Sequence, residues 1–282
     1  MSLELPSQVE NHLQLLSPQE KANISFSFEI KRKLQEAEPE ASELPLIYIG
    51  SGGDVLTALL VSGSKRIVLI DSHPFLTKET KKDEQTETYS TVEEMLTAVD
   101  PRADRIGLST HWQSVRPAVQ MIAQLEKIGI PREDIDIETN GENADLTIHL
   151  GDETVVVNFR SRKIYSFSDL KFLLGQLKIN DGYGLLAKAG GGGTVQTIIE
   201  QSHGSESVVP SYFVVDDPRS EANKALTAKE EEDMYPGYDL TENKSNEKTL
   251  WGYSWGDDSN SSRSTEKRAP DYKTRAVIGI LK

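Results

Sequence analysis

Glycines and aspartates gather at one turn of the chain, between two short apolar runs. The run Leu46–Ile49 stops at Gly50-Ser51-Gly52-Gly53, and Asp54 then begins a segment whose apolar residues recur at helical spacing. The second run ends at Asp71. Glycines after a strand let a ligand approach the main chain, the first N–H groups of the next helix point to the same place, and an acid ending the next strand can accept bonds from a ribose. The pattern predicts a strand–helix–strand unit with a nucleoside site at the carboxyl ends of its strands.

The spacing of the glycines selects among nucleotide sites. A dinucleotide site requires a further glycine at the sixth place, where this chain has Val55, whose side chain would crowd the helix against the strand. No Gly-Lys-Ser/Thr follows the turn, which excludes a Walker-type triphosphate site. Two simpler interpretations stay open: the turn is only a connection, and Asp54 only caps the helix.

The same residues resemble a known family. The strings IYIGSGGDVLTALL and RIVLID are similar to the first motif and the following acidic strand end of class I S-adenosylmethionine-dependent methyltransferases. The resemblance implies S-adenosylmethionine as the cofactor, with its amino-acid part at the glycine loop and its ribose on Asp71. The acid that the family commonly has two residues before the first glycine is Tyr48 here. The aminopropyltransferase branch tolerates a non-acid at that place, so an aminopropyltransferase-like enzyme is an alternative.

The resemblance also implies a fold. It is an α/β, Rossmann-like methyltransferase fold: a mostly parallel sheet with helices on both faces and a C-terminal antiparallel hairpin. We expect an N-terminal helical segment at 1–43, with a helix start at Ser17-Pro18 and a possible short strand in SFSFEI, and a Rossmann-like domain at 44–282. A polar stretch at about 235–273, which holds Tyr235, Tyr238, Trp251, Tyr253 and Trp255, is expected to be an ordered loop over the sheet or a flap that contacts substrate.

Two further segments bear on the predicted site. In the family, the loop after the third strand often contacts the adenine amino group, which implies such a role for Glu142 and Asn143. The competing interpretation is a plain hairpin, because Asn-Gly is a strong turn signal, followed by a further strand at 154–159 that makes a meander. His73 either faces the nucleoside or lies exposed. The predicted cofactor contacts are Gly50, Ser51, Gly52, Gly53, Asp54, Asp71, Ser72, Glu142 and Asn143.

No conspicuous catalytic motif is present, and methyl transfer does not require one. The sulfonium of the cofactor already activates the methyl group, so the protein chiefly aligns donor and acceptor. The family's Asn/Asp-Pro-Pro-aromatic signature is missing after the fourth strand, which we expect at 144–150. His149 and Asp152, at the carboxyl end of that strand, are weak candidates for a general base. The resemblance therefore implies an S-adenosylmethionine-dependent methyltransferase, and we expect it to act on an unidentified small molecule. A non-catalytic nucleoside-binding or interaction protein on the same fold is the alternative from another class.

Composition limits the other classes of function. The net charge of −14 argues against nucleic acid as a partner, because a phosphate backbone would be repelled. The chain has no cysteine, which excludes disulfides and thiolate chemistry, and its five histidines lack metal-ligand spacing, so no metal site is predicted. No apolar run approaches the ~20 residues of a membrane span and the N-terminus lacks a signal pattern, so we expect a cytoplasmic protein away from membranes.

Overall fold

The computed structural model describes residues 7–16, 18–37, 43–79, 86–99, 116–180, 182–188, 192–202, 212–216 and 275–281 of the chain. Within these ranges the chain has an α/β architecture with one eight-stranded sheet and a separate two-stranded sheet. The predicted polar loop at 235–273 lies outside the described residues. Among the helices in the described ranges, none is long and apolar enough to cross a membrane.

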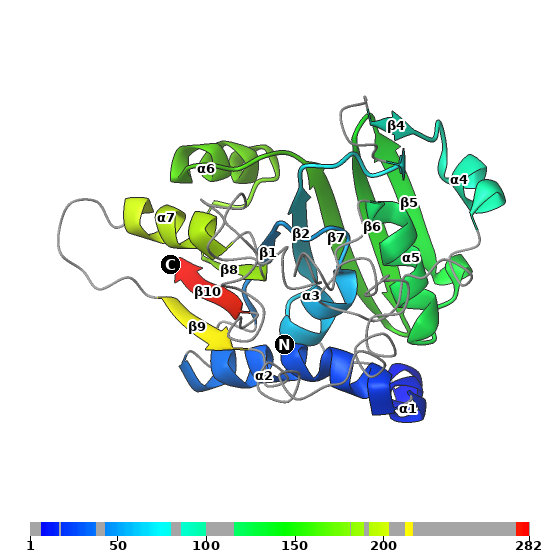
Figure 1. Ribbon diagram of the computed structural model, residues 1–282, viewed down its shortest axis with the longest axis horizontal. Helices are drawn as coiled ribbons and strands as arrows, with labels where there is room; N and C mark the ends of the chain where they lie inside the picture. Colours follow the sequence, from blue (N-terminus) through cyan, green and yellow to red (C-terminus); the bar gives the residue numbers. More distant parts are fainter. Residues whose placement is uncertain are drawn as a thin grey trace, which may run out of the picture.

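The large sheet has β1 near its centre. Its strands are β1 (Leu46–Ile49), β2 (Arg66–Asp71), β5 (Ile135–Asn140), β6 (Asn143–Leu150), β7 (Glu153–Ser161), β8 (Tyr183–Lys188), β9 (Tyr212–Asp216) and β10 (Arg275–Leu281). Across the sheet they follow the order β5-β6-β7-β2-β1-β8-β10-β9 (Figure 1). The small sheet pairs β3 (Thr77–Glu79) with β4 (Glu87–Thr88).

Seven helices connect or cover these strands in the described ranges. They are α1 (Ser7–Leu15), α2 (Pro18–Ala37), α3 (Val55–Val61), α4 (Val92–Ala98), α5 (Pro117–Lys127), α6 (Phe167–Gln176) and α7 (Gly192–Ser202), with a short 3-10 helix at Arg132–Asp134. The predicted strand–helix–strand unit is confirmed: it consists of β1, α3 and β2, and β1 pairs with β2 in parallel.

The sheet is mixed, so the prediction of a mostly parallel sheet is wrong. Strands β7, β2, β1 and β8 run parallel, whereas β5 and β6 at one edge and β10 at the other are paired antiparallel, in four of the seven pairings. The turns from β5 to β6 and from β6 to β7 have two residues each. A turn of that length can only reverse the chain, because a parallel connection needs a crossover of about a dozen residues or more. The predicted antiparallel pairing of the last two strands is confirmed.

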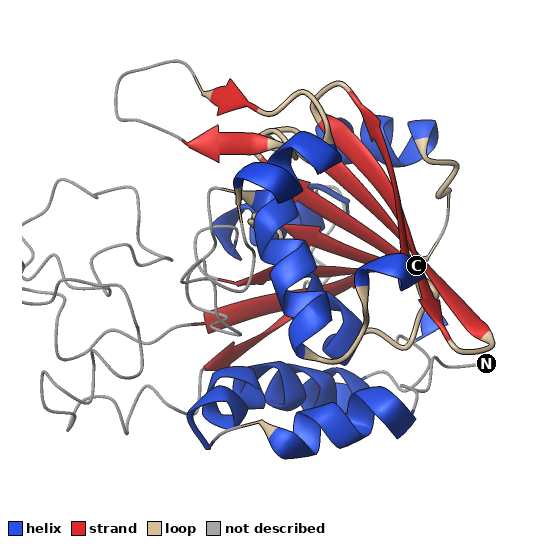
Figure 2. Cartoon of the chain, turned by 90° about the vertical axis from the view of Figure 1, so that its right-hand side faces the viewer, coloured by secondary structure: helices blue, strands red, loops and turns tan. Residues whose placement is uncertain are grey.

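Helices cover both faces of the sheet, as predicted. Tyr48 and Leu69 bury on one face against apolar residues of α2, α3 and α5. Ile47 and Ile70 bury on the other face against residues of α6 and α7. This alternation follows from the period of two along a strand, which sends neighbouring side chains to opposite faces. Figure 1 and Figure 2 show the twisted sheet with helices against it, and α1 and α2 below it.

The N-terminal segment is helical and packs directly on the core. Helix α2 begins at Pro18, as predicted, and continues through the string SFSFEI, so the possible strand there is wrong. Phe26 and Ile30 are fully buried in the core that contains α3. Ser27 Oγ lies 3.0 Å from Thr57 Oγ1 of α3 and is hydrogen-bonded to it. Burial of this face favours the helix over a strand, whose side chains would alternate toward water.

Candidate functional site

The glycine turn and Asp71 lie side by side at the carboxyl ends of β1 and β2. Gly50, Gly52 and Gly53 have φ values of 67°, 56° and 87°, which favour glycine. The N–H of Ser51 donates to the carbonyl of Ile70 over 3.0 Å. The N–H of Gly52 donates to Oδ2 of Asp71 over 2.8 Å. The turn is therefore fastened to the end of β2 through main-chain donors.

Among the described residues, three donors hold the Asp71 carboxylate. Besides Gly52 on Oδ2, the main-chain N–H of His73 donates to Oδ1 over 3.0 Å and His73 Nδ1 lies 2.8 Å from the same oxygen. Asp71 is only 7% exposed. A carboxylate offers about four acceptor positions, so about one remains, on Oδ2. The contact with His73 was not predicted from the sequence. Its sequence signal is an aspartate whose side chain can accept from the main-chain N–H two residues later, as in an Asx turn.

Asp54 is a helix cap. Its Oδ1 accepts from the N–H of Thr57 and from Nε2 of Gln124, both at 3.2 Å, and its Oδ2 accepts from the hydroxyl of Tyr48 at 3.2 Å. Asp54 is 2% exposed and Tyr48 is fully buried. Of the two roles left open by the sequence, the cap is the one observed. The departure from the family at Tyr48 also has a structural role, because the phenol donates to this cap.

Helix α5 closes over the glycine turn. The N–H of Leu56, in the first turn of α3, donates to Oε1 of Gln124 over 3.1 Å, and that of Val55 donates to the carbonyl of Gly53 over 2.8 Å. A Cβ placed on Gly53 would lie 2.5 Å from the carbonyl oxygen of Pro117. The first amides of α3 thus bond within the protein, against the expectation that they point at a ligand. Gly53 makes room for α5.

The remaining predicted contacts within the turn differ in exposure. Ser51 is fully buried, and its Oγ has no hydrogen-bond partner in the part of the chain that the structure describes. Gly50 is partly buried, whereas Ser72, directly after Asp71, is exposed. An unsatisfied buried hydroxyl is costly in a folded protein, so Ser51 is a donor and acceptor available for a polar group at the turn.

Glu142 and Asn143 lie at the same edge of the sheet as Asp71, in a plain hairpin. Asn143 is the first residue of β6, and Asn143 Oδ1 accepts from the N–H of Ser161, which stands opposite Asp71 in the β2–β7 pairing. The carbonyl of Glu142 accepts from the N–H of Phe75 over 2.9 Å, while its side chain is exposed. The hairpin interpretation is confirmed. The turn nevertheless packs against the loop that follows Asp71.

His149 and Asp152 lie at the opposite end of the strands from Asp71 and the glycine turn. Because β6 runs antiparallel to β7, the end of β6 lies beside the start of β7, and β7 runs parallel to β2. His149 Nε2 lies 2.9 Å from Oδ2 of Asp136 and is hydrogen-bonded to it. The expectation that these two residues border the nucleoside site is corrected by the direction of β6, and we assign them no part in it.

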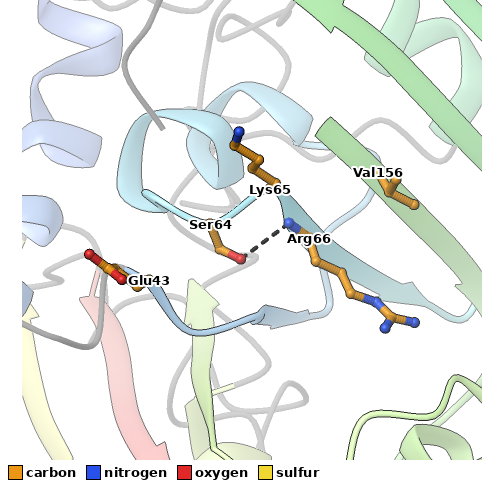
Figure 3. A pocket seen from close by; sticks show the side chains of 5 residues that line it. All are labelled: Glu43, Ser64, Lys65, Arg66 and Val156. Carbon is orange, nitrogen blue, oxygen red and sulfur yellow. Dashed lines mark hydrogen bonds between the residues drawn. The ribbon is translucent and has the colours of Figure 1, made fainter. Parts of the chain in front are cut away.

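A cavity of about 410 Å³ also lies away from the glycine turn, at the start of β2. It is lined by Glu43, Ser64, Lys65, Arg66 and Val156 (Figure 3). In Figure 3 the side chains of Lys65 and Arg66 point in different directions, and Lys65 Nζ pairs with Glu153 Oε1 at 3.1 Å. Polar groups that diverge do not make a binding constellation, so this cavity is no candidate for the nucleoside.

A polar network on the antiparallel part of the sheet makes stability depend on pH. Burial would raise the pKa of Asp145, but hydrogen bonds from Arg160 (2.7 Å) and Asn158 (2.6 Å) outweigh it and hold the pKa below its usual value. A lowered pKa stabilises the fold above the unfolded-state pKa of about 3.9, and this contribution is lost as the pH falls through the folded-state value. The difference in unfolding free energy between the parent and Asp145→Asn, measured with urea, should therefore shrink from pH 6 to pH 3. An equal difference at both values would contradict this assignment.

Among the described residues, no group of three or more His, Asp or Glu could hold a metal ion. Comparisons of the chain with protein-family models, with curated proteins and with solved structures gave no match.

Proposed function

We propose that the chain is an S-adenosylmethionine-dependent methyltransferase that binds the cofactor where β1 and β2 end, with Asp71 as the acceptor for the ribose. The observation that carries the proposal is the Asp71 carboxylate, buried and fastened to the glycine turn by the 2.8 Å bond from Gly52. The buried hydroxyl of Ser51, which has no hydrogen-bond partner among the described residues, belongs to the same turn. The acceptor substrate is proposed to be a small molecule.

The topology supports this location. From β1 the chain leads to β2 on one side and later to β8 on the other, both parallel to β1. In open α/β sheets, ligands bind outside the carboxyl ends of the strands where the strand order reverses in this way. The glycine turn follows β1, so it stands at that point. The parallel centre and the antiparallel β9–β10 pair also agree with the Rossmann-like methyltransferase fold, which we infer for the chain.

A non-catalytic protein on the same fold is the second candidate. The observation that favours it is that the turn is already hydrogen-bonded within the protein. The N–H of Leu56 donates to Gln124 and that of Thr57 donates to Asp54. Gly53 is in close contact with Pro117. A nucleoside would then have to be held by Asp71, Ser51 and the loop after β2 without the helix amides.

Calorimetric titration with S-adenosylmethionine, S-adenosylhomocysteine, the decarboxylated cofactor and NAD tests the binding step. We expect the parent to bind the first two, and Asp71→Asn to lose about tenfold or more in affinity, because hydrogen bonds to a charged acceptor contribute about 1.5–3 kcal/mol. The matched control is Asp136→Asn, an exposed acid that pairs with His149 away from the turn. Equal affinity of Asp71→Asn and the parent would contradict the ribose assignment.

A transfer assay separates the two candidates. A protein that binds S-adenosylmethionine and passes a labelled methyl group to a small molecule is the enzyme, and one that binds without transfer to a broad acceptor mixture is the non-catalytic alternative. Preference for the decarboxylated cofactor would favour the aminopropyltransferase-like enzyme. A parent that binds no adenosyl ligand would contradict the proposal.

A further inference from the structure

In the described ranges, Asp71 has three donors, and only one of them is a side chain, the imidazole of His73. The other two donors, on Gly52 and on His73 itself, are main-chain N–H groups. Main-chain donors cannot leave the carboxylate without moving the loop, whereas an imidazole can turn away by rotation about its own side-chain bonds. The side chain of His73 is 29% exposed and that of Asp71 is 9% exposed. The imidazole is therefore the more exposed partner of the pair.

From this arrangement we propose that the imidazole of His73 occupies the acceptor position on Asp71 that a ribose hydroxyl takes, and that nucleoside binding displaces it. The inference rests on the proposed function and adds a residue that tunes recognition of the ribose. No bond other than hydrogen bonds is made or broken.

The count of acceptor positions requires this exchange. A ribose presents two neighbouring hydroxyls, and binding both needs two positions on the carboxylate. Three of about four are taken in the structure, so only one hydroxyl can be accepted while the imidazole stays. The Nδ1···Oδ1 distance of 2.8 Å equals the usual length of a hydroxyl–carboxylate bond, so a hydroxyl fits in place of the N–H.

The same geometry determines for which ligands the imidazole of His73 changes the affinity. A ligand with both ribose hydroxyls must displace the imidazole and lose its bond to Asp71. A 2′-deoxy ligand needs one acceptor position, which is already available on Oδ2. His73 thus weakens binding of the ribose form relative to the deoxy form, and it does so through Asp71 without contacting the ligand.

Affinities of the parent and His73→Ala for S-adenosylhomocysteine and its 2′-deoxyadenosine analogue test this inference. We expect His73→Ala to bind the ribose ligand about fivefold more tightly, which corresponds to one net hydrogen bond of about 1 kcal/mol, and the deoxy ligand equally well. The matched control is His149→Ala, which removes a histidine–aspartate pair of similar geometry at the other edge. Equal or weaker binding of the ribose ligand by His73→Ala would overturn the inference.

A second measurement uses the unaltered protein. In a ¹⁵N NMR spectrum of the histidine rings, assigned with the His73→Ala variant, the hydrogen-bonded Nδ1–H of His73 should disappear when the protein is saturated with S-adenosylhomocysteine. Its persistence at saturation would overturn the inference while leaving the proposed function intact. If neither the parent nor the variant binds any adenosyl ligand, the proposed function fails and the inference fails with it.

Discussion

Replacement of Gly53 by alanine is expected to lower the free energy of unfolding by about 3 kcal/mol. Gly53 has a φ of 87°, and an added Cβ would lie 2.5 Å from the carbonyl oxygen and 2.8 Å from the Cα of Pro117. A strained backbone of this kind costs about 1–3 kcal/mol, and overpacking a filled contact costs about the same. Both atoms belong to the main chain of α5, so no side chain can rotate to relieve the contact. Urea unfolding of the two proteins measures the difference.

Gly151→Ala is the matched control for this experiment. Gly151 has a φ of 64° in the turn between β6 and β7, and nothing lies within 4 Å of the Cβ that alanine would add. Its replacement should cost about 1 kcal/mol, the conformational part alone. If both variants lose the same stability, the close approach of Pro117 does not explain Gly53.

The Gly53 experiment also bears on how the glycine turn is interpreted. If the missing side chain were reserved for a ligand, alanine would lower affinity and cost only the conformational part of the stability, about 1 kcal/mol. The contact with Pro117 predicts the reverse order, with the larger loss in stability. Asp54 holds the start of α3 and the buried side chains of Tyr48 and Gln124 through both carboxylate oxygens, so we assign it to the structural part of the turn. In the proposed site, the residues of this group left for a ligand are Ser51, Gly52 and Asp71.

Local patterns in the sequence were sufficient for much of the fold. The apolar runs before Gly50 and before Asp71 predicted β1 and β2, and Asp54 before a helical pattern predicted the start of α3. Contacts between distant segments have no such signal. Gln124 reaches the N–H of Leu56 across 68 residues of sequence, and nothing near the glycine turn indicates that α5 lies above it. For this reason, the sequence could not predict that α5 covers the glycine turn.

The direction of a strand was the other missing information. The pattern predicted a strand at 144–150 and placed candidate bases at its carboxyl end. That end lies beside Asp71 only if the strand is parallel to β1, and the two-residue turn at Gly151-Asp152 makes β6 antiparallel to β7, which runs parallel to β2. The same reversal brings the start of β6, with Asn143, to the edge where Asp71 lies. The direction of β6 thus decides which of its residues lies near Asp71: Asn143 does, and His149 does not.

Replacement of Asp54 by alanine should also cost about 3 kcal/mol. The cap of α3 is lost, which is worth about 1 kcal/mol, and the buried hydroxyl of Tyr48 and amide of Gln124 both lose this acceptor. Loss of an acceptor for a buried donor costs about 1–3 kcal/mol, so the cap is the smaller part of the effect. Urea unfolding again measures the loss.

Thr91→Ala separates the cap from the buried network. Thr91 caps α4 with its hydroxyl on the N–H of Glu94 at 3.0 Å, but Thr91 is exposed. Its replacement removes a cap but leaves no buried donor without an acceptor, so it should cost about 1 kcal/mol. A loss at Asp54 no larger than that at Thr91 would mean that Tyr48 and Gln124 find other acceptors. The turn could then rearrange, and its hydrogen bonds within the protein would no longer argue against ligand binding there.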